Sequence, residues 1–114
     1  RGGAWAKCSC RILIGIEQES DFQVVGRLIG PKGANMKNIV EKVPDAKIRI
    51  RGRGSRFLEG PQQVESTDPL MICVTASRSE SFETAATLVE ELLRKVQSEY
   101  ARYCQRRGRP EPMH

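Results

Sequence analysis

The sequence predicts an α+β fold in which three helices pack on one face of a three-stranded antiparallel sheet. Three short apolar segments have the length and pattern of strands, and three other segments carry apolar residues at helical spacing. Their order along the chain is strand, helix, helix, strand, strand, helix. The 114 residues contain no internal repeat and are enough for one modest hydrophobic core.

The predicted strands cover residues 10–16, 46–51 and 69–76. In the first, Ile12, Ile14 and Ile16 alternate to one face, which is typical of a strand with one buried side. The second reads AKIRIR, so Ile48 and Ile50 lie on one face and three basic residues lie on the other. The third reads PLMICVTA and is almost continuously apolar, which favours a central strand.

The predicted helices cover residues 22–29 and 34–43 and a long segment that starts near residue 77 and continues past residue 103. Asp21 is suited to cap the first helix, and Pro44 ends the second. The third helix starts either at Ser79 or at a capping box formed by Ser77 and Glu80. Its apolar residues recur on one face throughout.

We expect residues 1–9 to be a lead-in, residues 10–104 to form the domain with an extended C-terminal helix, and residues 105–114 to be a flexible basic tail. Residues 52–68 contain three glycines and one proline and are expected to form a long mobile loop, which is uncommon without a function. No apolar run approaches the roughly 20 residues of a membrane span, so we expect a soluble, intracellular protein.

The sequence Gly30-Pro31-Lys32-Gly33 separates the first two predicted helices. Two glycines three residues apart allow a tight turn and a close approach to something outside the chain. The helix that follows directs its free N–H groups towards this turn, and such groups favour an anion. Lys32 adds a mobile positive charge. The loop is therefore suited to hold a phosphate backbone.

The net charge of +5 is unevenly distributed along the chain. Residues 27–56 contain nine Lys or Arg and two acidic residues, a net charge of +7, whereas the remaining residues sum to −2. A solvated basic face is the simplest interpretation of such a run. Because the excess charge coincides with a loop suited to phosphate, we favour a nucleic-acid partner.

The sequence provides little support for catalysis or for a cofactor. The four cysteines have no CxxC spacing and the only histidine is His114, so we predict neither a zinc site nor any other metal or cofactor site. We expect the cysteines to be reduced and to act as small hydrophobic residues. A P-loop is excluded because Gly26 and Gly30 are one residue too close and Gly33 follows Lys32. We predict that the protein is not an enzyme.

The run VVGRLIGPKGANMKNI followed by AKIRIRGRGS resembles a type I KH domain, over roughly residues 10–96. The resemblance implies a βααββα fold that clamps about four single-stranded nucleotides with a GxxG loop. The GPxG loop and the turn Arg51-Gly52-Arg53-Gly54-Ser55 are most similar to those of branchpoint-binding splicing factors and STAR proteins. The connection around Pro44 is one residue longer here, and no accessory helix is identified, so the sequence preference of those proteins is not transferred.

The resemblance implies that RNA is bound by Gly26, Arg27, Leu28, Gly30, Pro31, Lys32, Gly33, Lys37, Arg49, Ile50, Arg51 and Arg53. The loop would contact the sugar-phosphate backbone through Lys32 and Gly33 donors, since Pro31 has no N–H. Gly26 would leave room for a base, Leu28 would floor the groove and Ile50 would form its opposite wall. The groove would be bordered by Arg27, Lys37, Arg49, Arg51 and Arg53.

Several side chains remain open to two interpretations. Val25, Ile29 and Ile48 fit the core or the groove, and we favour the core for Ile48. Gln23 and Arg53 could hydrogen-bond base edges. Phe57 would either stack on a base or fold back on the domain.

We therefore expect a single-stranded RNA-binding module that acts in splicing or another step of mRNA processing or regulation, in the nucleus, the cytoplasm or both. One alternative is a KH-fold scaffold that binds a protein or dimerises through its long last helix, where Val96, Tyr100 and Tyr103 continue the apolar face. Another is binding of single-stranded DNA, because nothing in the sequence indicates how a 2′-hydroxyl would be sensed. A salt titration separates nucleic-acid binding from dimerisation, because only the former weakens steeply with salt.

Overall fold

The three predicted strands pair into one antiparallel sheet in a computed structural model that describes residues 8–16 and 21–108. The elements are β1 (Cys8–Leu13), α1 (Val24–Ile29), the 3₁₀ turn η2 (Pro31–Gly33), α2 (Ala34–Lys42), β2 (Ala46–Arg51), β3 (Met71–Ala76) and α3 (Ser79–Arg106). The predicted α+β class and βααββα order are confirmed.

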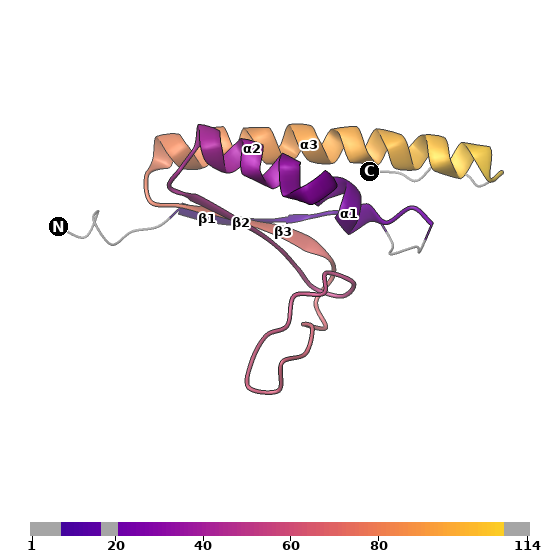
Figure 1. The fold of residues 1–114 in the computed structure, drawn as a ribbon, viewed down its shortest axis with the longest axis horizontal. Coiled ribbons are helices and arrows are strands. Elements are labelled where there is room, and N and C mark those ends of the chain that lie inside the picture. The colour runs from indigo at the N-terminus through magenta and orange to yellow at the C-terminus, as the bar shows by residue number, and fades with distance from the viewer. Residues whose placement is uncertain (1–7, 17–20, 109–114) are drawn as a thin grey trace.

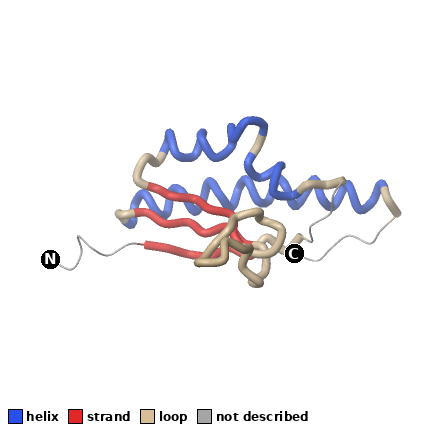
Figure 2. Tube along the Cα trace, turned by 60° about the horizontal axis from the view of Figure 1, so that its bottom comes forward, coloured by secondary structure: helices blue, strands red, loops and turns tan. Residues whose placement is uncertain are grey.

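The strand order is β1-β3-β2, with both outer strands antiparallel to β3 (Figure 2). The almost continuously apolar β3 occupies the centre, as its pattern predicts. The register places Ile12 and Ile50 opposite Ile72 on the two sides of β3. Since side chains alternate along a strand, one face of the sheet is apolar and the other carries polar and basic residues.

The helices cover only the apolar face of the sheet, whereas the loop between β2 and β3 extends on the other side (Figure 1). The core lies between this face and the helices. Its fully buried side chains come from every layer and include Ile14, Leu28, Ile72, Val74 and Val89. The helix-free side is called the open face below.

Several element boundaries differ from the sequence prediction. β1 begins two residues earlier than expected and its pairing ends at Leu13, although Ile14 still donates its N–H to the carbonyl of Leu70 at 3.2 Å. α3 includes residues 105 and 106, which were assigned to the tail. The predicted lead-in and tail otherwise fall largely on residues 1–7 and 109–114, which lie outside the described residues. The domain limits remain predictions.

Two predicted helix caps are wrong. α1 starts at Val24, and the preceding Gln23 adopts a left-handed conformation without a side-chain cap. Asp21 instead accepts a hydrogen bond from Arg107 at 2.8 Å. α3 begins at Ser79, one of the two predicted starts, but its N-cap is Arg78, again without a side-chain cap, and the Ser77 hydroxyl donates to Asp45 at 2.9 Å. In both cases the side chain predicted to cap the helix forms a hydrogen bond with a residue distant in the sequence.

The C-terminal part of α3 packs against other parts of the same domain. The residues that were predicted to form an apolar dimer face are therefore covered. Val96, Tyr100 and Tyr103 are all buried. Phe22, which is 1% exposed, contacts both tyrosine rings, at centroid distances of 5.0 and 5.3 Å. The dimerisation argument based on these three residues is therefore wrong. No helix among the described residues is long and apolar enough to span a membrane.

Candidate nucleic-acid interface

The GPKG loop makes its turn through three residues with positive φ. Gly30 has φ 83° and ψ 167°, a combination open essentially only to glycine, while Lys32 and Gly33 are left-handed with φ 56° and 76°. Pro31 and Lys32 are exposed at the tip. The Gly33 N–H donates to the Gly30 carbonyl at 3.1 Å. The prediction that Gly33 supplies a free donor is therefore corrected, because this N–H already closes the turn.

Asn35 holds the loop in place, and the sequence analysis missed it. Its Nδ2 group donates to the carbonyls of Arg27 and Leu28, at 3.1 and 3.2 Å. Carbonyls in the last turn of a helix have no partner within the helix, so Asn35 satisfies the end of α1 from the start of α2. A Cβ atom built on Gly30 would lie 2.8 Å from the Asn35 side chain. The signal available in the sequence was an asparagine two residues after the loop, a residue type that can donate to such carbonyls.

An open hollow of about 340 Å³ lies beside the loop. It is lined by Asp21, Phe22, Gln23, Gly26, Arg27, Gly30 and Pro31. Gly26 is exposed there, and a Cβ atom added to it would meet nothing closer than 3.8 Å. The structure thus brings together Gly26, Gly30 and Pro31, with Gln23 next to them. The predicted residues of β2 do not line this hollow.

Arg27 has a structural role that the sequence did not reveal. Its Nε donates to the Phe22 carbonyl at 2.6 Å, and its guanidinium carbon lies 4.1 Å from the centroid of the Phe22 ring. The same side chain pairs with Glu99 of α3 at 3.2 Å. Arg27 therefore fastens α1 to α3, and it also lines the hollow beside the loop.

Leu28 is not the floor of the groove, because it is 0% exposed and belongs to the core. Val25, Ile29 and Ile50 are half-buried, and Val25 and Ile50 pack against the core from its margin. The core interpretation of Ile48 is supported by its contact with the same cluster. α2 packs against β2, an outer strand of the sheet, and Ile50 lies half-buried on the face of β2 that packs against the core.

The basic side chains of β2 lie on the open face of the sheet. Ile48 and Ile50 pack against the core, so the alternating Lys47, Arg49 and Arg51 point the other way. The prediction that Arg49 and Arg51 border the groove is corrected by this register. Arg53, beyond the end of the strand, and Lys37 on α2 are exposed as predicted.

The loop after β2 folds back onto the open face. Phe57 is half-buried, with the guanidinium carbons of Arg49 and Arg51 5.6 and 5.9 Å from its ring centroid. Of the two interpretations of Phe57, the structure therefore shows the second. Glu59 forms an ion pair with Arg51, and the hydrogen bond between them raises the pKa of the Arg51 guanidinium above its ordinary value. The positive charge of Arg51 is therefore balanced by the carboxylate of Glu59.

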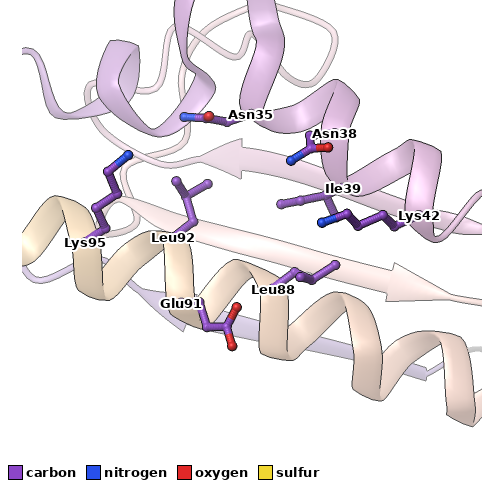
Figure 3. A pocket seen from close by; sticks show the side chains of 8 residues that line it. All are labelled: Asn35, Asn38, Ile39, Lys42, Leu88, Glu91, Leu92 and Lys95. Carbon is purple, nitrogen blue, oxygen red and sulfur yellow. The ribbon is translucent and has the colours of Figure 1, made fainter.

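A second hollow, of about 270 Å³, lies between α2 and α3. Figure 3 shows side chains of the two helices facing one another across it. Ile39, Leu88 and Leu92 supply its apolar surface, while Lys42 and Lys95 are offset in part by Glu91. Because this hollow lacks an exposed glycine and the GPKG turn with its exposed lysine tip, we place the candidate interface at the GPKG loop.

Comparison with known proteins identifies the family of the domain. The sequence model of the KHDC4/BBP-like family of type I KH domains matches residues 18–94. An uncharacterized protein of Schizosaccharomyces pombe, C30D11.14c, is 27% identical over 79% of this chain and 17% of its own length.

Two further relatives match the chain over shorter stretches. An Arabidopsis thaliana KH domain-containing protein, At5g56140, is 43% identical over 46% of this chain and 16% of its own length. The KH domain-containing, RNA-binding, signal transduction-associated protein 2 of Danio rerio is 40% identical over 50% of this chain and 16% of its own length. The predicted resemblance is confirmed, and the chain spans only a small part of these relatives.

Proposed function

The chain belongs to the KHDC4/BBP-like family of type I KH domains, and from this premise we propose that it binds single-stranded RNA by clamping about four nucleotides with its GPKG loop. The observation that carries the proposal is the loop itself. Its exposed Pro31-Lys32 tip is held between two helices by the left-handed backbone of Gly33 and by the Asn35 hydrogen bonds.

Each part of the surface has a chemical role in this proposal. The sugar-phosphate backbone follows the loop, where Lys32 and Lys37 supply positive charge and Gly26 and Gly30 present no side chain. The bases face the margin of the core at Ile50. Since β2 is an edge strand, half of its N–H and C=O groups lack a strand partner and are available to hydrogen-bond base edges. Phosphate contacts set position, whereas these base contacts set sequence preference.

We further propose that the parent protein acts in splicing or another step of mRNA processing, in the nucleus, the cytoplasm or both. The relative from Danio rerio is named as RNA-binding. Four nucleotides provide few contacts, and the chain spans 16–17% of its relatives' lengths. Additional binding elements in the parent protein would raise the affinity through effective concentration.

The proposal is tested by fluorescence anisotropy with a degenerate single-stranded RNA pool. The test variant is the double substitution Pro31→Asp, Lys32→Asp, which places carboxylates where the backbone phosphates would lie. The matched control is Arg94→Asp, Ser98→Asp, which makes the same change in net charge at two exposed positions of α3. Circular dichroism verifies that all three proteins are folded.

We expect binding by the wild type and by the control, and its loss in the loop variant. Equal binding by both variants would instead indicate a merely basic surface and overturn the clamp. Absence of binding by the wild type would overturn the RNA-binding function. Competition with a DNA pool of the same length distinguishes RNA from single-stranded DNA, and stronger competition by DNA would refute a preference for RNA.

A further inference from the structure

The open face of the sheet carries a row of basic side chains that the groove does not use. The register places Arg11 of β1 and Arg49 of β2 on either side of Cys73, and Lys47 on the same side of β2 as Arg49. Residues on neighbouring strands lie about 4.8 Å apart, so Arg11 and Arg49 are about 10 Å apart at their Cα atoms. All three basic side chains are exposed. We refer to Arg11, Lys47 and Arg49 as the open-face triad.

Within the described part of the chain, the triad has no acidic neighbour among the strand residues of its face and no ion-pair partner. The strand residues that share this face are Ser9, Arg11, Leu13, Lys47, Arg49, Arg51, Met71, Cys73 and Thr75, none of which is acidic. Ion pairs of the described residues involve Arg27, Arg51 and Arg107, but no member of the triad. The glutamates of the loop are occupied, since Glu59 pairs with Arg51 and Glu65 accepts backbone N–H groups of residues 54 and 56.

The triad also lies next to the proposed groove. β2 is an edge strand, so its two faces meet along the free edge of the sheet. Ile50, the proposed groove wall, alternates with Lys47 and Arg49 along this strand. A nucleic-acid strand that leaves the groove can therefore cross the edge of β2 to reach Lys47 and Arg49, with Arg11 farther along the same face, on β1. Exposed Leu13, at 61%, adds apolar surface on the far strand.

We propose that the open face is a second RNA contact surface, in which Arg11, Lys47 and Arg49 hold backbone phosphates of nucleotides beyond those in the groove. The charge decides the occupant, because three exposed cations on one face of the sheet complement a polyanion carrying one charge per nucleotide. The inference rests on the proposed function and extends its binding site to a longer strand. The contacts are to phosphates, so they add affinity without adding sequence preference.

The test compares degenerate RNA pools of four and twelve nucleotides, because only the longer strand can cover both surfaces. The variant is Arg11→Gln, Lys47→Gln, Arg49→Gln. Its control is Arg94→Gln, Arg102→Gln, Arg106→Gln, which removes the same charge from exposed positions of α3. Since a longer pool also offers more binding registers by statistics alone, variants are compared at each length.

We expect the triad variant to bind the four-nucleotide pool within about twofold of the control and the twelve-nucleotide pool at least about tenfold more weakly. Each lost phosphate contact lowers the slope of log affinity against log salt by about 0.7 for single strands, so the slope should fall by about 2 for the longer pool alone. Nearly equal behaviour of the two variants towards the longer pool would overturn the inference, as would an equal loss for both lengths.

Failure of the proposed function would give a different result. In that case the loop variant Pro31→Asp, Lys32→Asp would bind the four-nucleotide pool as the wild type does. If only the open-face inference is wrong, the triad variant would bind the twelve-nucleotide pool as its control does, while the loop variant would still lose binding of the four-nucleotide pool. The two hypotheses are therefore separated by strand length.

Discussion

Replacing Gly30 with alanine should destabilise the domain more than the same change at Gly33, although both glycines belong to one loop. At Gly30 the backbone conformation is one that L-residues avoid, at a cost of about 1–3 kcal/mol. The new methyl group would also lie 2.8 Å from the Asn35 side chain. Its displacement would break two hydrogen bonds worth about 1 kcal/mol each. Together these terms lower the free energy of unfolding by about 3 kcal/mol or more.

Gly33 is the matched control for this prediction. Its left-handed conformation costs an alanine about 1–2 kcal/mol, and the nearest atom to an added Cβ is Lys37 Cε at 4.0 Å. Urea unfolding of Gly30→Ala and Gly33→Ala, monitored by circular dichroism, measures both free energies. A smaller or equal effect at Gly30 would refute the reasoning.

A double-mutant cycle tests the proposed cause. Asn35→Ala removes the two side-chain atoms that lie 2.8 Å from a Cβ at residue 30 and leaves the Asn35 backbone nitrogen at 3.0 Å. Gly30→Ala should therefore destabilise the Asn35→Ala protein by about 1 kcal/mol less than the wild type. Additive effects of the two substitutions would show that the strain at Gly30 does not act through Asn35.

Three further predictions concern other parts of the domain. Gly26→Ala should stabilise α1 by up to about 1 kcal/mol, since there is room for the methyl group. The same substitution should weaken binding of the RNA pool several-fold, because the methyl group would occupy the space of a base. Unchanged affinity would mean that no base approaches Gly26. The Ser81 and Ser77 hydroxyls hold the pKa of Asp45 below its usual range, so its stabilising effect is present above about pH 4 and is lost as the pH falls through the lowered pKa. Urea unfolding between pH 5 and pH 2 should therefore show a weaker pH dependence for Asp45→Asn, and identical slopes would contradict this. Phe22→Ala should lower the free energy of unfolding by about 3–5 kcal/mol and reduce hydrogen-exchange protection around Tyr100, whereas unaltered protection would show that the ring does not fasten α3.

The sequence was most informative where a signal is local. The strict alternation of β2 separated Ile48 and Ile50 from the basic residues, and the structure has this arrangement. The apolar run of β3 indicated a central strand, because a strand that is paired on both edges and covered on at least one face has little contact with water and can consist almost entirely of apolar residues. The glycine loop between two helices was also evident, since backbone conformations with positive φ demand particular residues.

The errors came where a residue's role depends on a distant partner. Leu28 and Ile50 are both apolar residues near the loop, and only packing shows that Leu28 is fully buried while Ile50 stays at the margin of the core. Arg27 lines the hollow beside the loop, but only the structure shows that it also pairs with Glu99, 72 residues away in the chain. Val96, Tyr100 and Tyr103 looked like a dimer face until Phe22 was found against the tyrosines.

The sequence by itself thus determined the order of the elements, the strand patterns, the GPKG loop and the concentration of positive charge, because each follows from residue type and spacing over a few positions. Only the tertiary structure decided which basic side chains are paired, which face of the sheet they occupy and which residue locks the loop. Asn35 illustrates the difference: its side chain satisfies carbonyls seven and eight residues earlier in the chain, and that partnership exists only once the two helices are packed around the turn.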